Sequence, residues 1–250
     1  MSSTVCFWKV LILTLNRSIR IDPPKTTPKR VELKQEINGD ALPFFLRKIA
    51  INSLFFQKKY PNRVINSIYF DTHSLSTFDD SVSGNQIRKK HRIRWYDEHS
   101  GKSKVTYEIK CKDSQLSWKY LYKTSHRINA ETSRWGNLFD NEKGLKDLNF
   151  PTLLNLHPIT LVSYERSYFE SWNKKIRMTL DSKISFRDQR LLTKPNFKIF
   201  SYHTRSSIVE LKFSEEDLDL VKEVQKILKF KPQRFSKYCE SVTANNYSAR

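Results

Sequence analysis

The sequence predicts an α+β domain in which helices cover one face of an antiparallel β-sheet and charged residues occupy the other. Three observations support this fold class. Five short segments alternate between charged and apolar residues, as half-buried strands do. Two longer segments repeat apolar residues at helical spacing. Gly84 and the sequence "HSGK", which begins at His99, flank one expected strand with turn residues, as in a hairpin.

Composition limits the domain organisation and the partners. The 250 residues are 38% hydrophobic, which suffices for one large core, and nothing divides the chain from Arg30 onwards. We expect one domain over residues 30–243, an extension over residues 1–29 and a tail over residues 244–250. The formal net charge of +19 predicts an anionic partner, such as nucleic acid, a membrane surface, a nucleotide or polyphosphate.

Cysteine usage bears on the compartment of the protein. The three cysteines, Cys6, Cys111 and Cys239, are far apart in the sequence and odd in number. Neither a disulfide framework nor a zinc site can be built from this spacing. The pattern therefore predicts a reducing compartment, and we expect the protein to be cytoplasmic.

The N-terminal extension contains an apolar stretch from Val5 to Leu15, which Lys9 interrupts. A membrane span needs about 20 apolar residues, so this stretch is too short for one. It also lacks the basic start and the cleavage site of a signal peptide. We expect an extra strand or a loosely attached extension here, which leaves only a weak contact with a membrane surface open.

The alternating segments place charge on one face of the sheet. In "RKKHRIRWYDE" (residues 88–98) the Arg and Lys residues at even positions point one way, whereas Ile93 and Trp95 point the other way. The same alternation occurs in "RVELKQEI" (30–37), "VTYEIKCK" (105–112), "KKIRMTLDSKI" (174–184) and "SIVELKF" (207–213). The expected charged face carries Arg30, Glu32, Lys34, Glu36, Arg88, Lys90, Arg92, Arg94, Glu108, Lys110, Lys112, Arg177, Asp181, Glu210 and Lys212.

A solvated face would explain a single strand of this kind, because antiparallel sheets often have one wet face. Five such strands favour another explanation, since their polar faces carry Arg, Lys and Glu instead of the Thr and Ser that suit exposed strands. Like charges on neighbouring strands repel one another unless something neutralises them. The pattern therefore predicts a bound polyanion. If the sheet closes, the charged face lines a lumen and the apolar face packs against helices.

Two helices are expected to cover the sheet. The first spans "ALPFFLRKIAINSLFFQKKYP" and ends at Pro61, with an apolar stripe formed by Leu42, Phe45, Leu46, Ile49 and Phe56. The second spans "SEEDLDLVKEVQKILKF" and begins with Ser214 as its cap, with an apolar stripe formed by Leu218, Val221, Val224 and Leu228. We interpret both helices as packing elements.

Several other chemistries lack their sequence signatures. With only five glycines, the chain has neither a P-loop nor a dinucleotide-binding fingerprint. The nucleophile elbow G-x-S-x-G and histidine pairs at metal-binding spacing are absent from the sequence. Base-stacking motifs of the RNP type are missing too, although the aromatic and basic composition leaves RNA binding open.

Eight motifs, in order over about residues 30–243, resemble the VTC (vacuolar transporter chaperone) domain in its stand-alone form. They are "RVELKQEI", "NSIYFDTHSLSTFDD", "RKKHRIRWY", "YEIKCK", "SYERSYF", "IRMTLDSKISFRD", "IVELKF" and "RFSKYCESV". That family belongs to the triphosphate tunnel metalloenzymes. The resemblance implies a closed antiparallel β-barrel that forms a charged tunnel, with helices packed outside. It also implies a polyphosphate polymerase that moves the γ-phosphate of ATP onto a growing polyphosphate chain, with Mn²⁺ or Mg²⁺.

The resemblance also assigns roles to individual residues. Five cations are implied as catalytic residues: Lys34, Arg92, Arg94, Lys110 and Arg166. Seven residues are implied to bind substrate: Arg88, Lys90, Lys119, Tyr164, Arg177, Lys212 and Lys237. Glu210 is implied as the metal ligand. These residue types suit phosphoryl transfer, which depends mainly on positioning and charge stabilisation.

The sequence departs from the family pattern at two places. The basic residue expected after "EIKCK" is either Lys119 or Lys123, and we favour Lys119. Lys34 occupies the second acidic position of the E-x-E-x-K motif found in the hydrolase branch, which argues against a CYTH-type triphosphatase.

Two alternatives to a polymerase stay open at this stage. The same cations suit a tunnel phosphohydrolase that acts on triphosphate or on polyphosphate ends, with water as the nucleophile. They also suit a non-catalytic module that binds polyphosphate, a nucleotide or nucleic acid. The acidic residues Glu32, Glu108 and Glu210 favour a metal site over a simple anion binder, and no specific nucleic-acid partner is expected.

Overall fold

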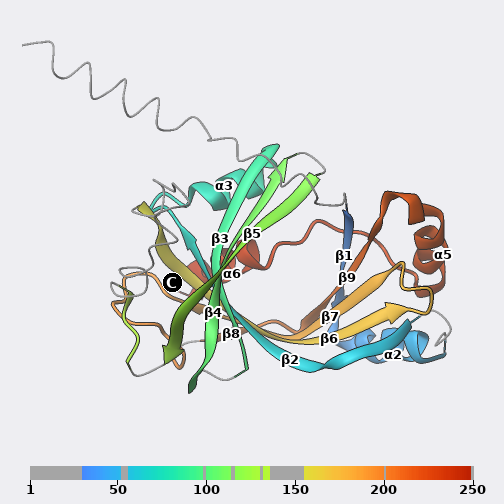
Figure 1. The fold of residues 1–250 in the computed structure, drawn as a ribbon, viewed down its shortest axis with the longest axis horizontal. Helices are drawn as coiled ribbons and strands as arrows, with labels where there is room; N and C mark the ends of the chain where they lie inside the picture. Colours follow the sequence, from blue (N-terminus) through green and yellow to red (C-terminus); the bar gives the residue numbers. More distant parts are fainter. Residues whose placement is uncertain are drawn as a thin grey trace, which may run out of the picture.

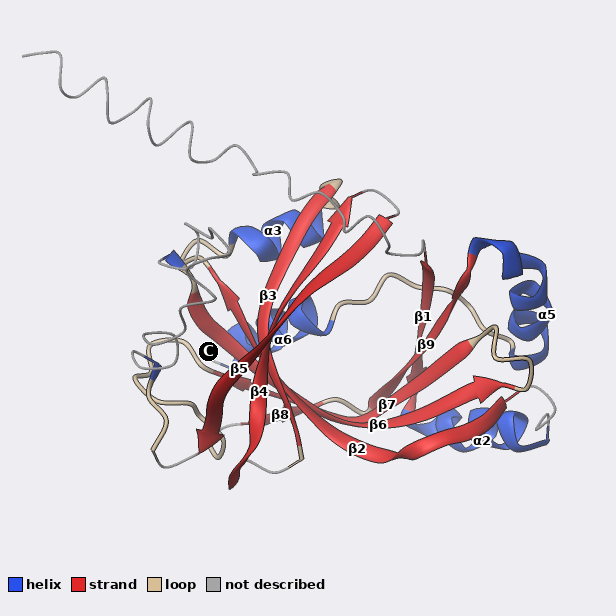
Figure 2. Cartoon of the chain, in the orientation of Figure 1, coloured by secondary structure: helices blue, strands red, loops and turns tan. Residues whose placement is uncertain are grey.

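The computed structural model describes residues 30–51, 56–97, 100–113, 116–129, 132–135, 155–199 and 201–248. The N-terminal extension therefore lies outside the described residues. The predicted α+β class is confirmed, since one large antiparallel sheet is combined with helices (Figures 1 and 2). None of the helices in these ranges has the length and apolar character that crossing a bilayer requires.

The described strands are β1 (Arg30–Asn38), β2 (Phe56–Asp71), β3 (Ile87–Tyr96), β4 (Ser100–Asp113), β5 (Leu116–Asn129), β6 (His157–Ser171), β7 (Arg177–Asp188), β8 (Ser201–His203) and β9 (Ser206–Ser214). The α-helices are α2 (Leu42–Ile51), α3 (Ser76–Ser83), α5 (Leu218–Leu228) and α6 (Lys237–Ser248), and the 3₁₀ turns are Gly39–Ala41 and Glu215–Asp217. Helix α6 extends into the expected C-terminal tail.

The strands form a curled sheet in the order β1-β9-β7-β6-β2-β3-β4-β5, and β8 pairs with β7. Figure 1 shows β3, β4 and β5 on one side and β1 and β9 on the other, with β2, β6 and β7 between them. The expectation of a closed barrel is not met, because no backbone ladder joins β1 to β5 in the described part of the chain. A side-chain contact crosses this seam instead, since Lys110 Nζ on β4 lies 2.9 Å from Glu32 Oε2 on β1.

The predicted alternation is confirmed in all five segments, and their apolar faces form two cores on the outer side of the sheet. One core packs α2 and α5 against β1, β7 and β9, through residues such as Phe45, Val221 and Leu211. The other lies on β2, β3, β4 and β5 and includes Ile93 and Trp95. A third cluster packs α6 against the opposite side, through Tyr238 and Val242.

The first predicted helix is too long. Helix α2 ends at Ile51, Phe56 already begins β2, and Pro61 lies within β2 at an irregular part of its pairing with β6. Proline is tolerated at such a bulge because no ladder hydrogen bond is needed there. Phe56 pairs with Ser171 of β6, and its side chain is buried in the core beneath α2 and α5, so tertiary contacts outweigh the helical spacing of this segment.

The second predicted helix is confirmed as α5, with Val221, Val224 and Leu228 buried. It differs from the prediction at its start, where a 3₁₀ turn follows Ser214. The Ser214 side chain makes no capping hydrogen bond, and Leu218 is exposed.

Helix α3 was not predicted. Asp71, at the end of β2, caps it by accepting hydrogen bonds from the backbone N–H groups of Thr77 (2.9 Å) and Phe78 (3.0 Å). Asp71 also accepts a hydrogen bond from the Tyr238 hydroxyl of α6 (2.5 Å), so one buried carboxylate holds two helices. Gly84 ends α3 with φ 76°, which confirms the predicted turn before β3. Strands β3 and β4 pair as the predicted hairpin, whereas His99 lies outside the described residues.

Candidate active site

All the residues that the sequence analysis assigned to a site lie on the face of the sheet opposite the two outer cores. We call this face, which carries Glu32, Lys110 and Arg92, the inner face. The assigned residues come from seven strands and one helix: Lys34 (β1), Arg88, Lys90, Arg92 and Arg94 (β3), Lys110 (β4), Lys119 (β5), Tyr164 and Arg166 (β6), Arg177 (β7), Glu210 and Lys212 (β9) and Lys237 (α6). Arg177 and Lys119 are the most exposed of them.

The first ionic cluster joins β2, β3 and β4. Arg92 Nη2 lies 2.6 Å from Glu108 Oε1, and Arg94 Nη1 lies 3.5 Å from Glu108 Oε2. Burial raises the pKa of Glu108, but the two guanidinium groups outweigh burial and hold this pKa at about 2. Arg92 Nη1 also donates a hydrogen bond to the Tyr69 hydroxyl (2.9 Å). This network fixes a fork of cations at the centre of β3.

The second cluster is centred on Asp181 of β7, which is fully buried. Arg166 binds it in a bidentate manner, with Nε 2.6 Å from Oδ1 and Nη2 2.7 Å from Oδ2. Lys237 Nζ lies 2.6 Å from Oδ2, and it also lies 4.8 Å from the centre of the Tyr164 ring. Burial raises the pKa of Asp181, but Lys237 and Arg166 lower it below its ordinary value. Both cations are thereby held in place.

The third cluster lies on β1, β4 and β9. Lys212 Nζ lies 2.9 Å from Glu210 Oε1 and 3.4 Å from Glu32 Oε1, while Lys110 binds the other oxygen of Glu32. Burial raises the pKa of Glu210, yet Lys34 and Lys212 lower it well below its usual range. The backbone register explains the arrangement, because Lys34 pairs with Glu210 and Glu32 pairs with Lys212.

Burial lowers the pKa of two lysines of the inner face, Lys34 and Lys90. Burial lowers the pKa of Lys34 to about 8. Burial also lowers the pKa of Lys90, whose ammonium donates a hydrogen bond to the Ser236 hydroxyl (2.9 Å) just before α6. With a pKa of about 8, Lys34 still carries its proton to a large extent at neutral pH.

The inner face differs from the sequence prediction in its charge balance. We expected crowded cations that repel one another, but carboxylates lie between them and pair with them. Glu32 and Glu108 were noted as acids, whereas the pairing role of Asp181 was missed although its parity placed it on this face. Tyr69 was also missed. Its position opposite Arg92 follows from the β2–β3 register, which the sequence alone does not give.

The carboxylates of the third cluster are the best candidates for a metal ligand. In the described ranges no group of three or more His, Cys, Asp or Glu side chains is arranged to hold a metal ion. Mg²⁺ and Mn²⁺ sites in phosphate-binding proteins often use only one or two carboxylates, together with phosphate oxygens and water. Glu210, with Glu32 across Lys212, fits this type of site.

Comparisons with solved structures show the fold. A candidate adenylyl cyclase from Hippeastrum, described as having a dominant triphosphatase activity, is 14% identical with a TM-score of 0.51, over 86% of this chain and 96% of that chain. A candidate adenylate cyclase from Vibrio parahaemolyticus is 13% identical, with a TM-score of 0.48, over 87% and 99% of the two chains. A protein from Pyrococcus horikoshii OT3 is 16% identical, with a TM-score of 0.45, over 88% and 99%.

Sequence comparisons identify the family. No curated protein matches the chain. The family model described as the VTC domain matches residues 29–246, which include every strand described above, helices α2, α3 and α5, most of α6, and all three ionic clusters. The chain therefore belongs to the VTC domain family.

Proposed function

We propose that the protein is a metal-dependent polyphosphate polymerase that transfers the γ-phosphate of ATP onto a growing polyphosphate chain. The family supports a function that involves triphosphate or polyphosphate. The observation that carries the proposal is the inner face itself, where three ionic clusters hold more cations than carboxylates in fixed positions. A ligand with many negative charges along its length would bind to several of these clusters at once.

The chain's own residues would position the reactants. Arg92 and Arg94 present planar guanidinium groups that suit fork-like contacts with phosphate oxygens. Asp181 holds Arg166 and Lys237 in advance, so these cations lose little freedom when phosphate binds. Lys34 would stabilise the negative charge that the transferred group carries.

Glu210 would hold the metal together with Glu32, and a bound Mn²⁺ or Mg²⁺ would neutralise phosphate charge. We expect Glu210→Gln to abolish metal-dependent turnover, because an amide oxygen binds these cations less well than a carboxylate. Turnover at several Mn²⁺ concentrations measures the effect. Glu216→Gln, at an exposed position after β9, is the control. Unchanged turnover in Glu210→Gln would remove Glu210 from the metal site.

Hydrolysis is the second candidate function. The same cations would bind a triphosphate, and water would replace phosphate as the nucleophile. The triphosphatase activity described for the Hippeastrum protein, which shares the fold, favours this alternative. The position of Lys34 in place of an acidic residue favours the polymerase.

One experiment separates these functions. Purified protein is incubated with ATP and Mn²⁺, and the products are resolved on a gel that detects polyphosphate. Long chains together with ADP support the polymerase, whereas released phosphate without chains supports the hydrolase. Tight binding of tripolyphosphate without either product supports a binding module. Arg166→Ala should reduce activity or binding in each case, and Arg47→Ala on the exposed side of α2 is the matched control.

A further inference from the structure

The loop between β7 and β8, residues 189–199, lies at the end of the molecule opposite α2 and α5 (Figure 1). It presents apolar side chains to solvent. Leu191 is 100% exposed, and Leu192 and Ile199 are exposed as well. Leu191 has φ 59°, in the left-handed region that Asn and Gly adopt more easily than a branched residue. Neither packing nor backbone preference explains a leucine at this position.

Hydrogen bonds within the loop hold its backbone. The fully buried Gln189 side chain donates to the Asn196 carbonyl (2.8 Å) and accepts from the Asn196 N–H (2.8 Å). The Asn196 amide donates to the carbonyls of Asp188 (3.1 Å) and Ile199 (2.9 Å). The exposed leucines therefore belong to a loop whose backbone is held by hydrogen bonds, and they are exposed despite these contacts.

Basic residues surround the leucines. Lys194 and Lys198 are exposed in the same loop, and Arg190 stands next to Leu191. Asp188 is the nearest acid in the sequence, and it already binds the Arg190 guanidinium, with Oδ2 2.5 Å from Nη2. The loop therefore combines a small apolar tip with a net positive charge.

We propose that residues 189–199 form a membrane-docking loop that inserts Leu191 and Leu192 into the interface of a bilayer containing anionic lipids. Apolar residues flanked by lysines are the combination that binds such surfaces, since the apolar tip enters the acyl boundary and the lysines contact the headgroups. A protruding tip suits a deformable bilayer, and the lysines match its negative charge. The loop does not belong to the inner face, so this inference is independent of the proposed function.

The test is sedimentation of the full chain with large vesicles made of phosphatidylcholine alone or mixed with phosphatidylserine. We expect binding to the mixed vesicles, and a loss of about tenfold or more in the variant Leu191→Asn/Leu192→Asn. Asn is favoured at positive φ, so this variant should fold, and its thermal unfolding is measured alongside. Lys194→Gln/Lys198→Gln should weaken binding to the phosphatidylserine vesicles.

Matched controls come from the opposite end of the molecule. Phe44→Asn removes a similarly exposed apolar side chain from α2, and Lys226→Gln/Lys231→Gln removes two exposed lysines; both should bind as the unchanged chain does. The proposal is overturned if the chain does not bind the mixed vesicles, or if the loop variants bind normally. It is also overturned if inorganic tripolyphosphate releases the chain, which would place the headgroups on the inner face. A change in oligomeric state without a change in vesicle binding would show instead that the loop joins two copies of the chain.

Discussion

Asp181 accepts hydrogen bonds from both Arg166 and Lys237, so one carboxylate sets the position of two cations. Glu108 accepts a hydrogen bond from Arg92 and forms an ion pair with Arg94 at 3.5 Å. At the scale of single residues, the inner face is thus a set of cations that are held by acids before any ligand arrives. This pairing changes what a substitution should do, because each paired cation contributes to stability in addition to its proposed role in binding.

Arg92→Ala is expected to destabilise the protein. The variant leaves Glu108 buried and only partly paired with Arg94, and removing one member of a buried ion pair costs about 3 kcal/mol. Urea unfolding of the variant measures the loss in the free energy of unfolding. The double variant Arg92→Ala/Glu108→Gln should recover part of it, because the unpaired charge is removed. If the variant is as stable as the unchanged chain, the prediction is wrong, and repulsion between these cations would offset the lost ion pair.

Lys34 predicts a pH dependence of triphosphate binding. Its pKa in the folded protein is about 8, below the ordinary value of 10.5, so it loses its proton as the pH rises through about 8. If it binds phosphate as a cation, the affinity for tripolyphosphate should fall above that pH. Titration calorimetry in buffers on both sides of pH 8 measures the change. Lys34→Arg should move the fall to higher pH, because a guanidinium keeps its proton. An identical pH profile in Lys34→Arg would assign the change to another group.

At the scale of elements, the strand period decides which side chains share a face. Lys90 and Lys89 are neighbours in β3, yet only Lys90 lies on the inner face, where it reaches Ser236. We expect Lys90→Ala to weaken tripolyphosphate binding about tenfold, since charged hydrogen bonds contribute roughly 1.5–3 kcal/mol, and Lys89→Ala to leave it nearly unchanged. Equal losses in calorimetric titrations of the two variants would contradict the facial assignment of β3.

The same period explains how much of the site could be predicted from the sequence. Within each strand, parity separates Arg92, Lys110 and Glu210 from the apolar residues without any knowledge of the fold. That these three charged faces coincide depends on how the strands pair. The pairing of Asp181 with Lys237 could not be predicted, because it depends on where α6 packs. The end of α2 was misplaced because Phe56 obeys the β2–β6 register instead of helical spacing.

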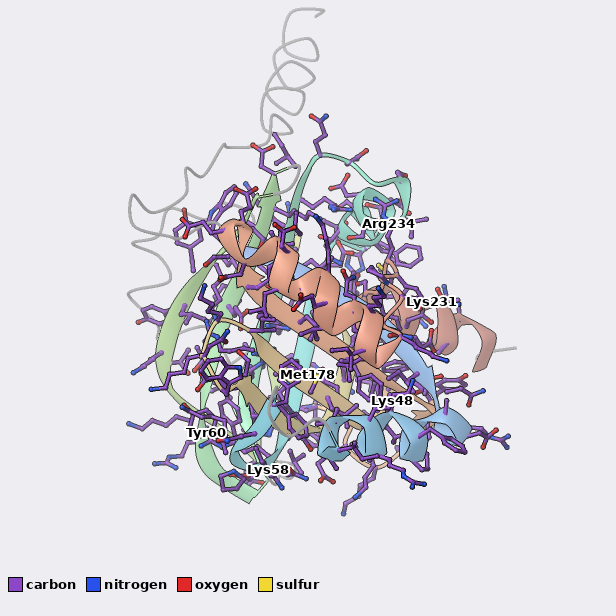
Figure 3. The ribbon with its side chains drawn as sticks, turned by 90° about the vertical axis from the view of Figure 1, so that its right-hand side faces the viewer. Lys48, Lys58, Tyr60, Met178, Lys231 and Arg234 are labelled. Atoms are coloured by element: carbon purple, nitrogen blue, oxygen red, sulfur yellow. The ribbon has the colours of Figure 1, made fainter. Side chains whose placement is uncertain are left out.

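At the scale of the whole molecule, basic side chains also lie outside the ionic clusters. Figure 3 shows α2 and the side chains of Lys48, Lys231 and Arg234 on the side of the molecule that lies to the right in Figure 1.

Two features of the whole molecule could not be predicted from the sequence. Closure of the sheet depends on the curl of the strands, and the seam between β1 and β5 is crossed by the Lys110–Glu32 contact in the part of the chain that the structure describes. The sequence alternation gives the faces of strands but not their curvature.

The whole molecule should distinguish linear polyanions from duplex nucleic acid. If tripolyphosphate binds several clusters of the inner face, as the proposed function requires, it should raise the melting temperature. A ligand that binds only the folded state stabilises it by about 2.7 kcal/mol at 100 times its dissociation constant. If the curled sheet encloses the inner face, duplex DNA should be excluded from it and should raise the melting temperature little. Thermal unfolding with each ligand makes the comparison, and equal protection by duplex DNA would indicate an exposed basic surface.

The pairing of β1 with β9 also determines when the chain can fold. Arg30 lies opposite Ser214, and the core beneath α2 and α5 draws its residues from both ends of the domain. Among the described strands β1 pairs only with β9, so during synthesis it lacks this partner until β9 has left the ribosome. Contacts so distant in sequence make folding slow, because the closure of a long loop must precede the contacts that stabilise it. Fragments that end before β9 should consequently fail to assemble this core, and the nascent chain would depend on protection from aggregation until α5 has been made.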